Sequence, residues 1–356
     1  MKIIFAIILT IHGLIHIMGF TKAYDYAKIA QLTKDISKPM GIIWLIVALL
    51  FVVATILLLL KNDGWLIPGV IAAIISQILI FSVWQDAKFG TIVNIVILVV
   101  AILSWGSIRF ENSYKNLVKE NLLRTNILKT DILTDADLLP LPEPVQRYLK
   151  YAGVVNKPKV KNVKVVFDGQ MREKGKDYFP FASEQFNFFD EPTRLFFMKG
   201  KIFGVNFLGY HKYSNGKAIM DIRFFGLFAI VKKSGDIMDK AETVTLFNDM
   251  CLLAPATLID KRIQWEIIND TLVKATFTNK KISIKAILYF NQQGQLVNFI
   301  SNDRDMNQYP FLTPVSEYKI INGYNLMSKA ETVWDYTDGK FTYGKFILKD
   351  IEYNIK

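Results

Sequence analysis

The sequence predicts a membrane α-helical domain, a four-span bundle, followed by an α+β domain whose large curved antiparallel sheet forms a half-barrel. Three observations support this prediction. Four long apolar runs lie within the first 110 residues, apolar and polar side chains alternate from Lys159 onward, and a helical stretch at about residues 240–260 interrupts that alternation. Because one apolar face of such a sheet needs a cover, we expect the helical insertion to lie on it.

The four apolar runs fill residues 3–20, 40–60, 65–83 and 91–108. Each run reaches the length of about 18–20 residues that a helix needs to cross a hydrocarbon core. No small-x-small cleavage site follows Phe20, so we expect the first run to be retained as a span. We therefore assign residues 1–110 to a multi-pass transmembrane domain in the plasma membrane of the cell, with the lipid bilayer as its partner.

The net charge of +11 is spread over the whole chain, and residues 1–110 contribute only +4 of it. Five basic residues lie near span ends on each side of the membrane, so the positive-inside rule gives no orientation. After residue 110, the excess of basic over acidic residues consists mostly of lysines scattered along strand-like segments. This pattern excludes the concentrated basic face of a nucleic-acid-binding protein. The scattered lysines are consistent with attraction to anionic lipid headgroups and equally with an ordinary solvated surface.

Two histidines, His12 and His16, share one face of the first span because they are four residues apart. Polar groups at membrane depth are costly, so the pair could form a metal or haem site or a proton relay. Two histidines lack the further ligands of a metal site. We therefore favour interhelical hydrogen bonding within the bundle and expect no metal and no other cofactor.

Residues 111–144 are polar, with weak helical periodicity, and we expect them to form a linker or stalk. Three prolines between positions 140 and 144 break any helix there. Residues 145–356 then form the β-rich soluble domain, with Asn-Gly and Asp-Gly pairs that favour tight hairpins. The helix at about residues 240–260 has apolar side chains at helical spacing up to Leu253, and Pro255 ends it.

Aromatic side chains are dense in this β-rich part and predict an apolar pocket. A helix that covers the sheet incompletely would leave a cleft for a lipid or another apolar molecule. The alternative is an ordinary sheet core. We expect the ligand to contact residues of both elements, namely Phe186, Phe188, Phe197, Phe207, Phe225, Phe247 and Met250.

Sequence motifs for catalysis are missing, so the catalytic residues are unknown. The chain has no P-loop, no dinucleotide-binding glycine pattern, no HExxH and no GxSxG. Its one cysteine, Cys251, cannot form an internal disulfide. Glu184, Glu242, Arg304 and Glu331 could line a cleft, although the sequence alone does not bring them together.

Short segments spread along the chain resemble an uncharacterised bacterial family of multi-pass membrane proteins with a C-terminal β domain. They include HGLIH at 12–16, WQDAKFG at 84–90 and LPEPVQRY at 141–148. That family has no established activity, so the resemblance assigns no functional residue. The expected half-barrel is also similar to LolA/LppX-like lipoprotein-carrier folds, which bind acyl chains, and this likeness concerns the fold alone.

Taken together, these patterns predict a membrane-anchored, non-enzymatic binding protein for a lipid or another apolar ligand. One alternative is a membrane enzyme or a redox or metal protein that uses His12 and His16. Another is a structural or assembly partner. The carrier analogy favours the outer side of the membrane for the soluble domain, whereas the basic residues after Arg109 favour the cytoplasm. We expect the outer side.

Overall fold

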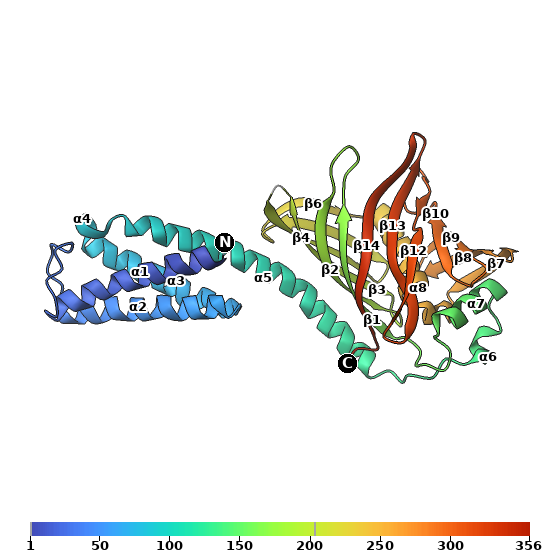
Figure 1. The fold of residues 1–356 in the computed structure, drawn as a ribbon, viewed down its shortest axis with the longest axis horizontal. Coiled ribbons are helices and arrows are strands. Elements are labelled where there is room, and N and C mark those ends of the chain that lie inside the picture. Colours follow the sequence, from blue (N-terminus) through green and yellow to red (C-terminus); the bar gives the residue numbers. More distant parts are fainter. Residues whose placement is uncertain (1, 203) are drawn as a thin grey trace. The chain divides into compact units, whose positions relative to one another are not determined.

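The computed structural model describes residues 2–202 and 204–356, which fall into two compact units, Met1–Arg109 and Phe110–Lys356. The first unit is helical and the second is built on a large sheet (Figure 1). The predicted fold class, four long apolar helices followed by an antiparallel half-barrel with a helix, is confirmed. Each unit is described separately below.

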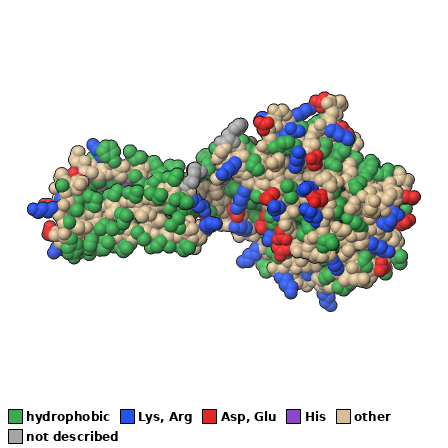
Figure 2. All heavy atoms as spheres, viewed as in Figure 1, with side chains coloured by type: hydrophobic (Ala, Val, Ile, Leu, Met, Phe, Trp, Pro, Cys, Tyr) green, Lys and Arg blue, Asp and Glu red, His purple; other side chains and the backbone are tan. Residues whose placement is uncertain are grey.

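The first unit contains α1 (Lys2–Ala23), α2 (Lys38–Leu59), a 3-10 turn (Asp63–Trp65) with α3 (Leu66–Ser82), the short α4 (Trp84–Ala87) and the start of α5 (Gly90–Asn126). Four of these helices are long and apolar enough to cross a membrane, as the sequence predicted. On the face drawn in Figure 2, hydrophobic side chains cover much of this unit, and Lys and Arg lie near its ends. Such a surface is typical of helices that face lipid.

Small residues let α1 and α2 pack closely. A Cβ atom at Gly19 would lie only 2.1 Å from a carbon of the Trp44 ring, and one at Gly41 only 2.4 Å from the Cβ atom of Ala23. Helices in membranes associate mainly through such close packing because lipid gives them no hydrophobic driving force. The sequence of this pair therefore fixes which faces meet.

The second unit begins with the end of α5, followed by α6 (Asp135–Leu138) and α7 (Glu143–Ala152). Its strands are β1 (Asn162–Met171), β2 (Phe179–Phe188), β3 (Thr193–Ile202), β4 (Val205–Ser214), β5 (Lys217–Phe224), β6 (Phe228–Ser234), β7 (Ile263–Asn269), β8 (Leu272–Asn279), β9 (Ile282–Phe290), β10 (Leu296–Ser301), β11 (Phe311–Leu312), β12 (Val315–Ile321), β13 (Tyr324–Tyr336) and β14 (Gly339–Tyr353). Between β6 and β7 lie α8 (Asp236–Leu253) and the 3-10 helix η2 (Pro255–Ile259).

All strand pairs are antiparallel, and the sheet has the order β6-β5-β4-β3-β2-β1-β14-β13-β11-β10-β9-β8-β7, with β12 paired to β13 off this path. Two runs of sequential strands, β1–β6 and β7–β10, therefore form the two wings. The pairing of β1 with β14 and the long β13 join these wings. The predicted turn pairs Asn322-Gly323 and Asp338-Gly339 connect β12 to β13 and β13 to β14.

Helix α8 lies within the curve of the sheet and contacts strands of both wings, including β4, β5, β9 and β10 (Figure 1). Beside β7–β10 the space is filled, because Phe247 of α8 stacks on Phe277 with 5.2 Å between ring centroids and meets Phe299 at 5.9 Å. Helix α7 closes this end of the core, where the Tyr148 hydroxyl donates to the Cys251 carbonyl. The predicted helix at about 240–260 corresponds to α8 and η2.

Residues 111–144, expected to be a linker, belong to the second unit in the structure. The first part of this segment continues α5, whose Phe110, Tyr114 and Val118 form an apolar stripe. This stripe packs on the outer face of β2–β4, where Tyr114 stacks on Phe197 at 5.1 Å. Strand β3 is buried on both faces as a result, which explains its continuous burial from Thr193 to Met198.

We predict that Tyr213→Phe destabilises the second unit. The Tyr213 hydroxyl is buried, lies 2.8 Å from the Thr243 hydroxyl of α8 and accepts a hydrogen bond from Asn279 of β8. It therefore ties both wings to the helix. Its removal leaves the buried Asn279 amide nitrogen without its partner, whereas the Thr243 hydroxyl keeps its bond to the Asp239 carbonyl. One unsatisfied buried donor costs about 1–3 kcal/mol. Thermal unfolding of the full chain should show a lower melting temperature.

Tyr289→Phe is the matched control, because the Tyr289 hydroxyl makes no hydrogen bond with the described residues. Equal melting temperatures for the two variants would contradict the role assigned to Tyr213.

Candidate functional site

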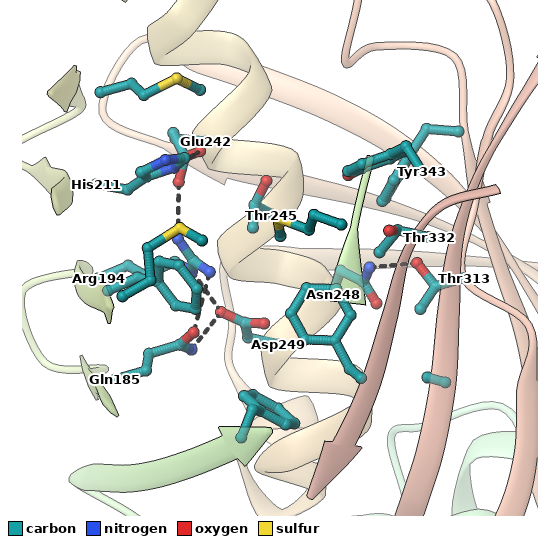
Figure 3. Close-up of a pocket in the computed structure, with 18 of the residues that line it drawn as sticks. Gln185, Arg194, His211, Glu242, Thr245, Asn248, Asp249, Thr313, Thr332 and Tyr343 are labelled. Atoms are coloured by element: carbon teal, nitrogen blue, oxygen red, sulfur yellow. Dashed lines mark hydrogen bonds and ion pairs between the residues drawn. The ribbon is translucent and has the colours of Figure 1, made fainter. Parts of the chain in front are cut away.

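A cavity of about 360 Å³ lies between α8 and the inner face of the strands β1–β5 and β13–β14 (Figure 3). It occupies the part of the half-barrel that α8 leaves uncovered. The helix contributes one polar row, Glu242, Thr245, Asn248 and Asp249, whose spacing places all four on one face. The cavity is therefore bounded by a polar helix face on one side and by the sheet on the other.

The sheet contributes mainly aromatic rings, methionines and isoleucines to this cavity. On β3 the alternating residues Arg194, Phe196 and Met198 face it, while Leu195 and Phe197 face α5. The other apolar side chains of the lining are Phe167, Met171, Phe179, Ile202, Phe207, Met220, Ile222, Ile230, Val231, Leu252, Leu253, Phe311, Met327, Ala330 and Phe346. Most of the wall can therefore contact an apolar molecule.

A buried charged cluster closes one end of the cavity. The Arg194 guanidinium donates to Glu242 at 3.1 Å and to Asp249 at 2.7 Å (Figure 3). Gln185 and Asn187 also donate to the same Asp249 oxygen, at 2.7 and 3.1 Å. The guanidinium is thereby surrounded by acceptors, as a buried cation requires. His211 completes the cluster, with its Nδ1 atom 3.7 Å from a Glu242 oxygen.

The two carboxyl groups of this cluster respond differently to one arginine. Burial raises the pKa of Asp249, and the bonds from Arg194 and the two amides only partly oppose it. Burial also acts against ionised Glu242, but Arg194, His211 and, last, the charge of Arg304 outweigh it and lower its pKa from 4.5 to about 2. A single cation cannot fully compensate two buried carboxylates, so Asp249 is the one that takes up a proton more readily.

A second arginine, Arg304, lies at the cavity in a different environment. Its guanidinium stacks over Phe311 at 4.0 Å from the ring centroid and donates to the Tyr343 hydroxyl at 2.5 Å. Trp334 lies farther away, at 5.8 Å. Among the described residues no carboxylate lies within 4.0 Å of this guanidinium. Arg304 is therefore a partly buried cation held by aromatic rings rather than by an acidic partner.

Two polar groups of the lining have unused hydrogen-bonding capacity. Asn248 donates to the Thr313 hydroxyl at 2.6 Å, but its own Oδ1 atom is buried without a partner (Figure 3). The Thr332 hydroxyl is likewise buried and unpartnered within the described part of the chain. Buried polar groups are nearly always bonded, so each such exception calls for an explanation.

Of the seven predicted ligand contacts, the structure places only Phe207 at the cavity. Phe186, Phe188 and Phe197 lie on the opposite face of the sheet, under the end of α5. Phe247 and Met250 are buried in the packed core between α8 and the second wing. The last of the seven, Phe225, lies in the β5–β6 turn with φ +52°.

Two of the four charged residues expected to line a cleft do so. Glu242 and Arg304 both line the cavity, whereas Glu184 bonds to Tyr114 on the outer face. Glu331 accepts from Thr342 at 3.3 Å and is not part of the lining. Arg194 was not selected as a candidate from the sequence. The pattern that could have identified it is its spacing on one strand, because Arg194, Phe196 and Met198 are alternate residues and so share a face of the sheet.

The polar residues of the first unit form a hydrogen-bonded cluster between helices. His12 Nε2 lies 2.9 Å from Asn94, and His16 Nε2 lies 2.9 Å from Ser76. The other ring nitrogen of His16 bonds to the His12 carbonyl at 2.8 Å. Among the described residues no group of three or more His, Cys, Asp or Glu is placed to hold a metal. These bonds are what the interhelical interpretation of the two histidines predicted.

A family model matches residues 131–346, from the segment before α6 to β14. The chain belongs to DUF6544, a family of unknown function. The sequence-based assignment to a family without established activity is confirmed. Within DUF6544, the match includes every element that lines the cavity.

Comparison with solved structures finds a LolA superfamily protein from Nitrosomonas europaea. It is 10% identical over 59% of this chain and 93% of that protein, with a TM-score of 0.33. No curated protein matches this DUF6544 chain.

We predict that Glu242→Gln changes how stability depends on pH. The pKa of Glu242 is about 2 in the folded protein and 4.5 ordinarily. Ionised Glu242 therefore stabilises the fold above about pH 4.5, and this contribution is lost as the pH falls toward 2. The variant should lose that part of the pH dependence and melt at a lower temperature at pH 7, because Arg194 loses a partner.

Melting curves of the full chain between pH 7 and pH 3 measure this difference. Glu266→Gln is the control, since its carboxylate is exposed and its pair with Lys274 contributes little. A Glu242→Gln curve parallel to that of the wild type would contradict the assignment.

Proposed function

We propose that this protein is a membrane-anchored, non-enzymatic binding protein for a lipid or another amphiphile. The observation that carries the proposal is the cavity between α8 and the sheet. Its volume of about 360 Å³ falls within the range of small-molecule sites, about 300–1,000 Å³. Phenylalanines and methionines line most of it, and methionine adapts readily to irregular apolar ligands.

A ligand can reach this cavity from the surface. The lining includes Ile230 on the edge strand β6, whose exposed fraction is 44%, and the exposed Glu173 after β1. The apolar wall therefore continues to solvent at this end. An amphiphile could enter tail first and leave its polar end near charged side chains.

The ionisable groups of the cavity support binding rather than catalysis. Arg194 bonds to both Glu242 and Asp249, so these charges compensate one another. Outside the lining, Cys251 is fully buried in the core and burial raises its pKa, which makes its thiol unreactive. The paired charges of the cavity shape the walls and polarity of a binding site.

The four apolar helices support anchoring in the plasma membrane as part of the same proposal. The prediction that the second unit faces the outer side stays a prediction. Alkaline phosphatase fused after Lys356 should be active, because it requires export, whereas green fluorescent protein at the same position should be dark after export through the Sec pathway. The opposite pair of results would place the domain in the cytoplasm.

Filling the cavity should abolish ligand binding, and Thr245→Phe does so from the polar face of α8. The Thr245 hydroxyl bonds only to the Ala241 carbonyl within its own helix, so little else is lost. We expect the purified wild-type chain to retain an amphiphile that native mass spectrometry and solvent extraction detect. The variant should retain less than about a tenth as much, since overlap of the ring with the ligand costs more than 1.4 kcal/mol.

Thr278→Phe is the control because it adds the same ring at an exposed position on β8. Its ligand content should match that of the wild type. A wild-type protein without bound amphiphile, or a Thr245→Phe variant with the full amount, would contradict the proposed function.

A further inference from the structure

We propose that the end of the cavity around Arg304 binds the anionic head group of the ligand, a carboxylate or a phosphate. The inference rests on the proposed function and specifies its ligand class, a long-chain amphiphile with one negatively charged end. The groups that would bind the head are Arg304, Tyr343, Asn248 and Thr332. They come from the loop after β10, from β14, from α8 and from β13.

Of the three arginines that line the cavity, Arg194 is buried, whereas Arg172 and Arg304 are half-buried, and Arg194 and Arg304 differ in how their charge is compensated. Arg194 faces two carboxylates, so it offers no charge to a ligand. Arg304 has the Tyr343 hydroxyl and the Phe311 ring but no ion pair among the described residues. A guanidinium has five N–H donors, and stacking leaves its edge free. An anion at this edge would provide the missing acceptor and the missing charge.

The unpartnered polar atoms lie at the same end of the cavity. Asn248 bonds to Thr313, which follows the strand that carries Phe311 beneath Arg304. Thr332 pairs in register with Gly344, the neighbour of Tyr343. In either orientation of the Asn248 amide, one of its two polar atoms has no partner. These groups add hydrogen bonds for a head that carries several oxygen atoms.

The rest of the cavity suits the apolar part of the same molecule. Phe196, Met198 and Phe207 form a wall on β3 and β4, and Ile230 extends it to the surface. The Arg194 cluster lies at the end of this wall on β3, and its charges are already paired. The charge pattern thus favours a single negative end over a zwitterionic or a neutral one.

The test compares a long-chain fatty acid with its methyl ester, which has the same chain and no charge. Both compete with a fluorescent fatty acid for the full-length protein in amphipol. We expect the wild type to prefer the acid by about 10- to 100-fold, the range for hydrogen bonds to a charged group. Arg304→Gln should remove the preference and leave ester binding unchanged, which also shows that the variant is folded. Arg304→Lys should keep part of it.

Arg172→Gln is the matched control. Arg172 also lines the cavity and stacks on an aromatic ring, 4.4 Å from the Tyr178 centroid, but its Nε atom donates to the Thr342 carbonyl. This variant should keep the full preference. Inorganic phosphate is added separately, and it should not displace the probe at concentrations where the acid does, because it lacks the apolar chain.

Each contrary result has a distinct meaning. Equal binding of acid and ester by the wild type overturns the head-group assignment and leaves the proposed function intact. Loss of the preference in Arg172→Gln but not in Arg304→Gln overturns the assignment to Arg304. Displacement by inorganic phosphate alone shows a site for a free anion and overturns the amphiphile. Binding of neither lipid overturns the proposed function itself.

Discussion

The structure of the second unit depends on one constraint, the covering of a very wide sheet by a single helix. Strands lie about 4.8 Å apart, so the 14-stranded sheet would be about 60 Å wide if it were flat. Helix α8 has 18 residues and a width of about 10 Å. The sheet therefore curls around the helix, and the helix fills only one wing of the curve. The cavity is the part of the concave face that remains uncovered.

The polar contacts of α8 determine the character of that cavity. On the filled side the helix presents Phe247 and other apolar side chains to β8–β10. On the open side it presents a row from Glu242 to Asp249, which Arg194 partly neutralises. Breaking such a buried pair is costly, so the row also fixes the helix against β3. Binding and stability thus share the same residues on this face. Arg304 acts on Glu242 only at longer range and makes no direct ion pair among the described residues.

Much of this architecture could be predicted from the sequence because it follows from local patterns. Apolar runs of sufficient length predicted the four membrane-spanning helices, and period-two alternation predicted the strands. The helical spacing of apolar residues before Leu253 predicted α8. The site was harder to predict. Phe186, Phe188 and Phe197 have the composition of a ligand pocket, but they face α5, which covers the outer side of β2–β4. That cover depends on Phe110, at the end of the expected transmembrane domain, and on Tyr114 and Val118, which lie in the segment expected to be a linker or stalk.

The choice between the two faces of a strand is a property of tertiary structure. Phe196 and Phe197 are adjacent and chemically identical, and only the positions of α5 and α8 decide which of them lines the cavity. Glu242 and Arg304 were two of the four charged residues that the sequence offered as possible lining of a cleft. Glu242 pairs with Arg194, whereas Arg304 has no ion pair among the described residues. Only the structure shows which carboxylates lie near each arginine.

The most direct test of the account is an electron cryomicroscopy map of the full-length protein purified from its native membrane without added lipid. The account predicts elongated density in the cavity between α8 and β1–β5, with one end at Arg304. Water-sized peaks alone, or a cavity filled by rearranged side chains, would contradict it.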